Sequence, residues 1–130
     1  MTTLRRMRTA AIVGDVIVIS ILTVVGFATH DTLDQTGRLL LTTGSFLVAW
    51  AFVGPWFRIV DERVVTRMVW VVPLAWIAAA PLGAVVRGLV LGIEVSPVFV
   101  VVMTAVTGAG LTLWRLILSR VARRSPISDD

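Results

Sequence analysis

Residues 9–29 read TAAIVGDVIVISILTVVGFAT, a run of 21 residues in which only Asp15 carries a formal charge. As an α-helix this run is about 31 Å long, which matches the hydrocarbon core of a bilayer. A carboxylate inside such a segment costs about 2.5 to 3.5 kcal/mol on insertion scales, so it is usually retained for a structural or functional reason. The run predicts a transmembrane helix, and Asp15 is its most informative residue.

Three more apolar runs follow, at residues 39–57, 68–86 and 95–114, and each is long enough to span a membrane. The chain has 130 residues, 57% of them hydrophobic, and a mean hydropathy of +0.92. A soluble domain of this length cannot bury so much apolar surface. The sequence predicts an all-α polytopic membrane protein. Its transmembrane domain is expected at residues 1–118, with four helices at about 9–29, 39–57, 68–86 and 97–117, and a short cytoplasmic tail at residues 119–130.

The distribution of arginine predicts the orientation. All 12 basic residues are arginine, and ten of them lie before the first run, between the second and third runs, or at the C-terminal end. Only Arg38 and Arg87 lie on the other side, so both termini are expected in the cytoplasm and the protein in the cell membrane. Trp56, Trp70 and Trp114 are expected at the same cytoplasmic interface. Despite a pI near 11.5, the arginines follow the helix ends rather than one soluble face, so no nucleic-acid partner is predicted.

The composition excludes most cofactor chemistry. The chain has no lysine for a Schiff base and no cysteine for a thiolate or an iron–sulfur cluster. Its single histidine, His30, cannot supply both axial ligands of a bis-histidine haem, and no helical pair has the spacing of a metal site. No nucleophile–base set is visible either. We expect no metal, no cofactor and no enzymatic activity.

Arg115 is the predicted partner of Asp15. Asp15 lies seven residues inward of Arg8, and Arg115 lies five residues inward of Arg120, so the two charges are at similar depth when both termini are on one side. Small residues at four-residue spacing, Gly108 among them, lead to Arg115 and indicate a helix–helix seam. We predict an ion pair that lowers the cost of burying both charges. The alternative is that Arg115 extends to the interface and Asp15 faces a wet crevice.

A second polar set is predicted at the outer side of the membrane: His30, Asp31, Asp34, Arg38, Arg87 and Glu94. These side chains would form either an outer vestibule or ordinary helix ends, and the second interpretation is favoured because exposed ion pairs contribute little. Histidine has a reference pKa near neutral pH, so His30 next to Asp31 is a candidate pH-sensitive group, but a histidine at a helix end is more often a cap or an interfacial anchor.

Several residues are predicted to shape the helix packing. Trp50 and Trp76 lie in the middle of apolar runs and are expected in the core. Gly26, Gly108 and Gly83 are expected where helices approach closely. Pro55, Pro73 and Pro81 are expected to kink the second and third helices.

Taken with their order and spacing, short fragments of the chain resemble a family of prokaryotic membrane proteins, domain-of-unknown-function family 3054. The fragments are Gly14-Asp15, Gly26-x-x-x-His30, Phe46-x-x-x-Trp50, Pro81-x-Gly83 followed by Arg87, and Trp114-Arg115. The resemblance covers nearly all of the hydrophobic part of the chain. It implies a four-helix membrane protein and implies no particular activity.

Two functional hypotheses remain open. The first is a small transporter or channel that uses Asp15, expected to be a homo-oligomer because four helices in one copy leave little room for a pathway. This architecture is similar to that of small multidrug resistance transporters, which also carry a carboxylate in the first helix. The second is a structural or accessory subunit in which the Asp15–Arg115 pair locks the bundle. In both cases the bilayer is the expected partner, and no substrate follows from the sequence.

Overall fold

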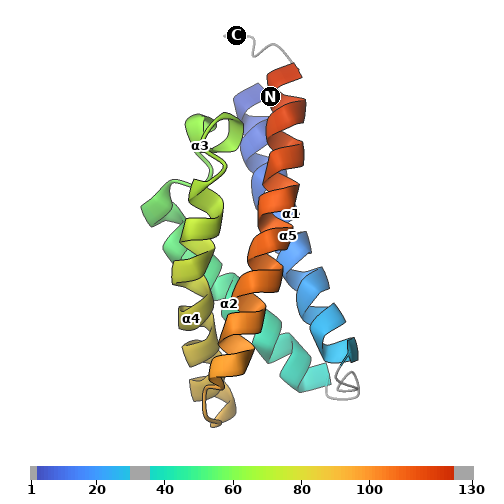
Figure 1. Cartoon of the computed structure of the whole chain (residues 1–130), viewed down its shortest axis with the longest axis vertical. Coiled ribbons are helices and arrows are strands. Elements are labelled where there is room, and N and C mark those ends of the chain that lie inside the picture. The colour runs from blue at the N-terminus through green and yellow to red at the C-terminus, as the bar shows by residue number, and fades with distance from the viewer. Residues whose placement is uncertain (1–2, 30–35, 125–130) are drawn as a thin grey trace.

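A computed structural model describes residues 3–29 and 36–124, which form five helices: α1 (Thr3–Thr29), α2 (Thr36–Phe57), α3 (Glu62–Thr66), α4 (Val71–Leu91) and α5 (Pro97–Arg124). All but α3 are long and apolar enough to cross a membrane. The predicted all-α class with four such helices is therefore confirmed. The long helices lie side by side, and the first and last described residues lie at the same end as α3 (Figure 1). We call this the α3 end.

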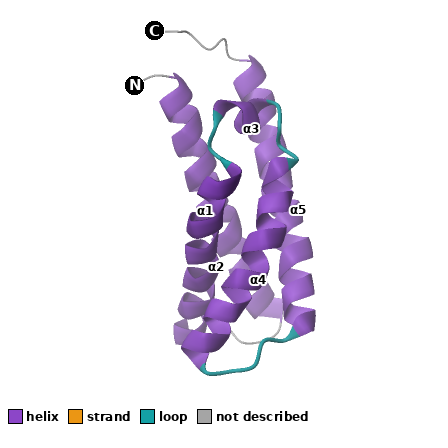
Figure 2. Ribbon diagram, turned by 90° about the vertical axis from the view of Figure 1, so that its left-hand side faces the viewer, coloured by secondary structure: helices purple, strands orange, loops and turns teal. Residues whose placement is uncertain are grey.

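The four long helices pack as a ring. α2 contacts α1 and α4, and α5 contacts α4 and α1, while the short α3 packs on α1 and α5. Figure 2 shows from the side that α4 and α5 run in opposite directions, with their connection at the end opposite α3. Large apolar side chains cover the outside of the ring, for example Leu89 at 79% and Phe52 at 63% exposure. Such an exterior is suited to lipid, which is as apolar as leucine.

Two apolar clusters fill the interior. The larger one contains Phe46, Trp50 and Trp76 with their neighbours on all four long helices. The smaller one lies at the α3 end, where Met7 and Val65 pack with Leu118 and neighbouring alanines. The buried charged residues Asp15 and Arg115 lie on α1 and α5, which, like the short α3, contribute to both clusters.

Most helices extend beyond the predicted boundaries, although α4 begins at Val71 rather than at residue 68. α1 begins at Thr3 rather than at residue 9, and α4 continues through Arg87 to Leu91. α5 continues to Arg124, so residues 119–124 belong to the helix rather than to a tail. The predicted boundaries followed the charges, but arginine is a good helix former, and cations near a helix C-terminus are favourable. α4 ends instead at Gly92, which adopts a left-handed conformation with φ of 66°.

The connection between α2 and α4 is folded and contains α3, a helix that no sequence pattern predicted. The amide of Arg58 donates to the Pro55 carbonyl and that of Ile59 donates to the Gly54 carbonyl, a Schellman motif that ends α2. The predicted prolines are accommodated within helices: Pro55 lies in the last turn of α2, and α4 continues through Pro81. Arg123 Nε donates to the Thr66 carbonyl at 2.7 Å and so ties α5 to the end of α3.

Candidate functional site

The structure brings Asp15 and Arg115 together at the centre of the α1–α5 seam. Arg115 Nη2 lies 2.6 Å from Asp15 Oδ2, and Arg115 Nε lies 2.9 Å from Asp15 Oδ1. This two-point contact matches the planar guanidinium to the planar carboxylate. The Arg115 side chain is 0% exposed and that of Asp15 is 1% exposed. Arg115 therefore does not extend to the interface.

Two further groups complete the polar cluster. Trp50 Nε1 donates to Asp15 Oδ2 at 3.1 Å, and Arg115 Nη1 donates to the Ile59 carbonyl at 2.7 Å. These contacts join α1, α2, α5 and the α2–α3 connection. A buried ion pair is tolerated when additional hydrogen bonds satisfy both partners, which is the situation here. We call Asp15, Trp50, Arg115 and the Ile59 carbonyl the buried polar cluster.

Sequence reasoning missed two members of this cluster. Trp50 was expected only as core packing, although a buried indole N–H needs an acceptor and Asp15 is the obvious one within the apolar runs. The Ile59 carbonyl is a backbone group, and the pattern of side chains in a sequence does not indicate which carbonyls are available as acceptors. It is available because the Schellman motif ends α2 just before it.

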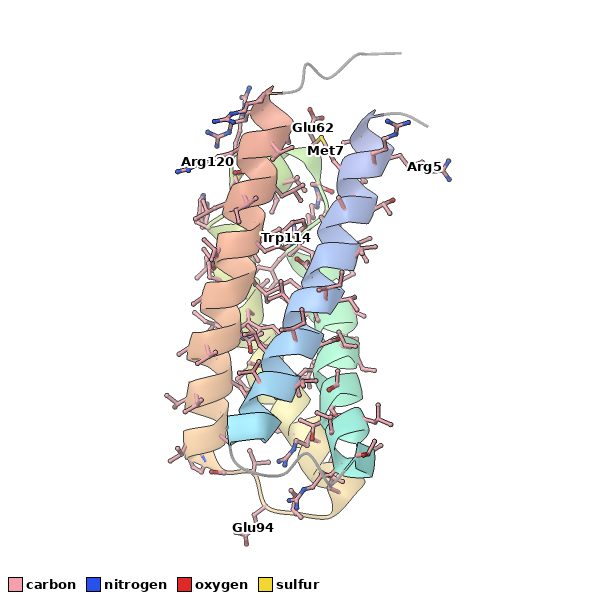
Figure 3. The ribbon with its side chains drawn as sticks, turned by 90° about the vertical axis from the view of Figure 1, so that its right-hand side faces the viewer. Arg5, Met7, Glu62, Glu94, Trp114 and Arg120 are labelled. Carbon is pink, nitrogen blue, oxygen red and sulfur yellow. The ribbon has the colours of Figure 1, made fainter. Side chains whose placement is uncertain are left out.

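Gly14 and Trp114, the neighbours of the paired residues, form a second contact across the seam. The Trp114 indole lies directly on Gly14, so that a methyl group at this position would overlap the ring. Figure 3 shows Trp114 between α5 and α1. Trp114 is therefore part of the seam rather than an interfacial anchor, whereas Trp56 and Trp70 are 79% and 58% exposed. The absence of a side chain at Gly14 lets α1 and α5 approach closely enough for the ion pair.

A cavity of about 470 Å³ adjoins the buried polar cluster. It lies between α1, α2 and the α2–α3 connection, and its lining is mostly apolar: Ile12, Val16, Leu47, Trp50, Ala51, Pro55, Ile59 and Val60. Asp15 contributes to one wall, and Arg58 and Asp61 contribute to another. We call it the α1–α2 cavity. Asp15 is thus bonded to Arg115, as predicted, and it also lines a mostly apolar cavity.

A second, charged hollow of about 460 Å³ lies at the α3 end. Its lining consists of Leu4, Arg8, Arg58, Asp61, Glu62 and Arg63. Arg58 and Asp61 line both this charged hollow and the α1–α2 cavity, so the two spaces are neighbours. In the sequence these arginines indicated only the orientation of the chain.

The predicted outer polar set is only partly covered by the structure. His30, Asp31 and Asp34 lie outside the described residues. Arg87 Nε donates to Thr42 Oγ1 at 2.9 Å, and its guanidinium lies 4.6 Å from the centre of the Phe99 ring. Arg38 and Glu94 are exposed, and Glu94 lies at the end opposite α3 (Figure 3). Arg87 therefore bridges α2, α4 and α5.

The predicted packing residues differ in their surroundings. Trp76 is fully buried, its Nε1 donates to the Met103 carbonyl at 3.2 Å, and its ring packs against Gly108. Gly83 makes room for the Phe46 ring. Pro81 is exposed, and within residues 3–29 and 36–124 no atom of another part of the fold lies within 4 Å of where a methyl group on Gly26 would be. Among the described residues, helices therefore pack closely at Gly108 and Gly83, but not at the site where a side chain on Gly26 would lie.

Within residues 3–29 and 36–124, no group of three or more His, Cys, Asp or Glu side chains is arranged to hold a metal ion. What the buried polar cluster offers chemically is a carboxylate paired at two points with a guanidinium, with an apolar space next to it.

Four helices long and apolar enough to cross a membrane, with a buried Asp–Arg pair between α1 and α5, define an integral membrane protein of the polytopic helical class. The chain belongs to the family described as protein of unknown function (DUF3054), whose model matches residues 12–118. The resemblance stated from the sequence is thereby confirmed. The matched segment begins just before Asp15 and ends just after Arg115, so it includes both partners. Searches of curated proteins and of solved structures gave no match.

Proposed function

We propose that this protein is a small membrane carrier whose substrate occupies the α1–α2 cavity. The observation that supports this most is the cavity next to the buried polar cluster. Its volume of about 470 Å³ is in the range of ligand-binding sites, which are mostly apolar with a few polar groups. Apolar walls with charged groups at their ends suit an amphipathic molecule.

The carrier is proposed to work as a homo-oligomer. Beyond the cavity the interior is filled, because the rings of Trp50 and Trp76 lie 5.7 Å apart and those of Phe46 and Trp76 lie 5.9 Å apart. A passage across the membrane therefore requires the helices to separate or a second copy to contribute a wall. For Asp15 to bind a proton or a substrate cation during transport, its bonds to Arg115 would have to open.

The carrier proposal is tested in proteoliposomes with three fluorescent amphiphiles: cationic rhodamine 123, NBD-phosphatidylcholine and NBD-phosphatidylglycerol. We expect the protein to accelerate transfer of at least one of them across the bilayer. Ala51 lines the cavity, so Ala51→Leu should reduce that transfer severalfold. Ala78→Leu is the matched control, since Ala78 is equally exposed on α4 and lines none of the hollows described above. No acceleration with any probe, or equal transfer in the two variants, would contradict the proposal.

A second candidate function is that of a structural or accessory subunit. It is favoured by the complete set of partners around the Asp15–Arg115 pair, because a buried pair with its hydrogen bonds satisfied serves to hold helices together. In this case exchanging the charges, Asp15→Arg with Arg115→Asp, should restore more stability than either single change retains. Rescue would be incomplete, since an aspartate at position 115 could not donate to the Ile59 carbonyl. A double variant no more stable than the singles would count against this candidate.

We further propose that the protein resides in the cell membrane with the α3 end in the cytoplasm. Ten of the 12 arginines belong to the termini or to residues 58–67, and arginine is enriched on the cytoplasmic side of membranes. No enzymatic reaction is assigned to the chain.

A further inference from the structure

We infer that the α1–α2 cavity and the charged hollow together bind one anionic phospholipid. A hydrocarbon chain occupies the cavity, and the phosphate lies among Arg8, Arg58 and Arg63. This inference rests on the proposed function, because it names the class of amphipathic molecule that binds in the cavity. Four features of the structure support it, and so do the depths of the two spaces.

The first feature is that the two spaces adjoin. Arg58 and Asp61 line both of them, so the two spaces meet at these residues, and a molecule that passes them would contact both linings. One space has an almost entirely apolar lining, and the other is lined by five charged side chains and Leu4. A molecule that fills both must have an apolar part and a charged part next to each other.

The second feature is that the cavity is accessible from the bilayer. Ile12 and Val16 line it, and they are 51% and 41% exposed on the outer surface of the ring. Ala51 on the facing helix α2 is exposed as well. A lipid chain can therefore enter sideways between α1 and α2 without crossing water.

The third feature is the charge of the hollow. Three arginines oppose two acidic residues, Asp61 and Glu62, which leaves one positive charge in excess. In the described part of the chain, no ion pair joins Arg8, Arg58 or Arg63 to another residue. Guanidinium groups bind phosphate through paired N–H donors, so these three arginines suit a phosphate oxyanion.

The depths of the two spaces also match a lipid. Arg8 precedes Asp15 by seven helical residues, or about 10 Å. The charged hollow therefore lies at the level expected for head groups, and the cavity extends from it into the hydrocarbon region. A phospholipid in its ordinary bilayer orientation would place its phosphate and its chain at these positions.

The fourth feature is the backbone of Arg58. Arg58 has a φ of 52°, and it is the one non-glycine residue with positive φ within residues 3–29 and 36–124. The C′ position of a Schellman motif favours glycine, because a side chain in this conformation is unfavourable. An arginine here indicates that its side chain is needed, and this side chain lines both spaces.

The test measures lipid binding to the purified full-length protein in detergent, by native mass spectrometry and by thermal unfolding. Dioleoyl-phosphatidylglycerol, dioleoyl-phosphatidylcholine and glycerol 3-phosphate are added separately. We compare the double variant Arg58→Gln/Arg63→Gln with Arg67→Gln/Arg120→Gln. The control pair removes the same charge from exposed arginines that line neither space.

We expect phosphatidylglycerol, but not phosphatidylcholine, to bind and to raise the unfolding temperature of the wild type and of the control pair. In Arg58→Gln/Arg63→Gln, affinity should fall about tenfold or more, since each lost charged contact corresponds to roughly this factor. Ala51→Leu should weaken binding where Ala78→Leu does not. Equal binding of both lipids, or equal loss in both arginine pairs, would overturn the inference. Glycerol 3-phosphate acting as well as the lipid would identify a free-phosphate site instead.

The binding experiment is independent of the transport experiment. If phosphatidylglycerol binds as described but no amphiphile crosses the bilayer faster, the lipid inference stands and the carrier proposal fails. If Ala51→Leu blocks transfer of rhodamine 123 while phosphatidylglycerol does not bind, the carrier proposal stands and the lipid inference fails.

Discussion

The Asp15 carboxylate accepts three hydrogen bonds from two side chains, and only one of the donors is not part of the ion pair. That donor is Trp50 Nε1, 3.1 Å from Asp15 Oδ2. Because Arg115 on α5 already balances the charge of Asp15, the indole N–H of Trp50 contributes chiefly by attaching α2 to the ion pair.

Replacing Trp50 with phenylalanine tests this role. Trp50→Phe retains an aromatic ring but leaves Asp15 without one of its donors. A hydrogen bond to a charged group contributes about 1.5 to 3 kcal/mol, so the free energy of unfolding should fall by roughly this amount. Unfolding in mixed micelles with increasing SDS measures it. Trp56→Phe, at a side chain that is 79% exposed, should change it little, and equal effects at both positions would exclude a special role for Trp50.

The second prediction for a single residue concerns the substitution of Gly14 by alanine. A methyl group there would overlap the Trp114 indole, so Gly14→Ala should push α1 away from α5 and lengthen the Asp15–Arg115 contact. Overpacking of this kind costs about 1 to 3 kcal/mol. The same unfolding measurement applies.

Gly44→Ala is the control for this substitution. No atom lies within 4 Å of its methyl position, and alanine favours a helix interior by about 1 kcal/mol over glycine. Stability should therefore stay the same or rise. A Gly14→Ala variant as stable as Gly44→Ala would show that the close approach is not required.

At the scale of elements, α3 is held by α1 and α5 rather than by its own five residues. Val65 packs in the cluster with Ala122, and Arg123 bonds to the last carbonyl of α3. Both contacts come from the part of α5 beyond the predicted helix end.

Two C-terminal truncations test whether the end of α5 holds α3 in place. Removing residues 119–130 should release α3 and let trypsin cleave the backbone after the exposed Arg63 and Arg67, while removing residues 125–130 should not. Loss of one hydrogen bond of about 1 kcal/mol and of the Ala122 contact should speed cleavage roughly tenfold. Limited digestion in detergent with mass analysis of the fragments measures this. Equal cleavage in the two truncations would mean that α3 is stable without the end of α5.

For the whole molecule, the arginines at the α3 end predict an orientation that can be measured. Fusions of green fluorescent protein and of alkaline phosphatase report the cytoplasmic and external sides respectively. Fusions at either terminus should be fluorescent and inactive as phosphatase, and fusions after Glu94 should behave in the opposite way, because α5 separates the two sites. Phosphatase activity at a terminus would contradict the cytoplasmic assignment of the α3 end.

Much of the fold was predictable because hydrophobic length is a local property. The four apolar runs correspond to α1, α2, α4 and α5, and the matching depths of Asp15 and Arg115 brought the pair within reach of sequence reasoning. Helix ends were less predictable, since charge marks the membrane boundary and not the end of hydrogen bonding. α3 lies among charged residues, and no apolar run marks it.

The sequence by itself determined that this is a four-helix membrane protein with one carboxylate in its first span, because each span must satisfy its own backbone and face lipid. The tertiary structure alone decided which groups surround that carboxylate. The indole of Trp50, the carbonyl of Ile59, the fit of Trp114 on Gly14 and the cavity at Arg58 each depend on residues from different helices or on a backbone turn. Such contacts arise from packing in three dimensions, which no single stretch of sequence encodes.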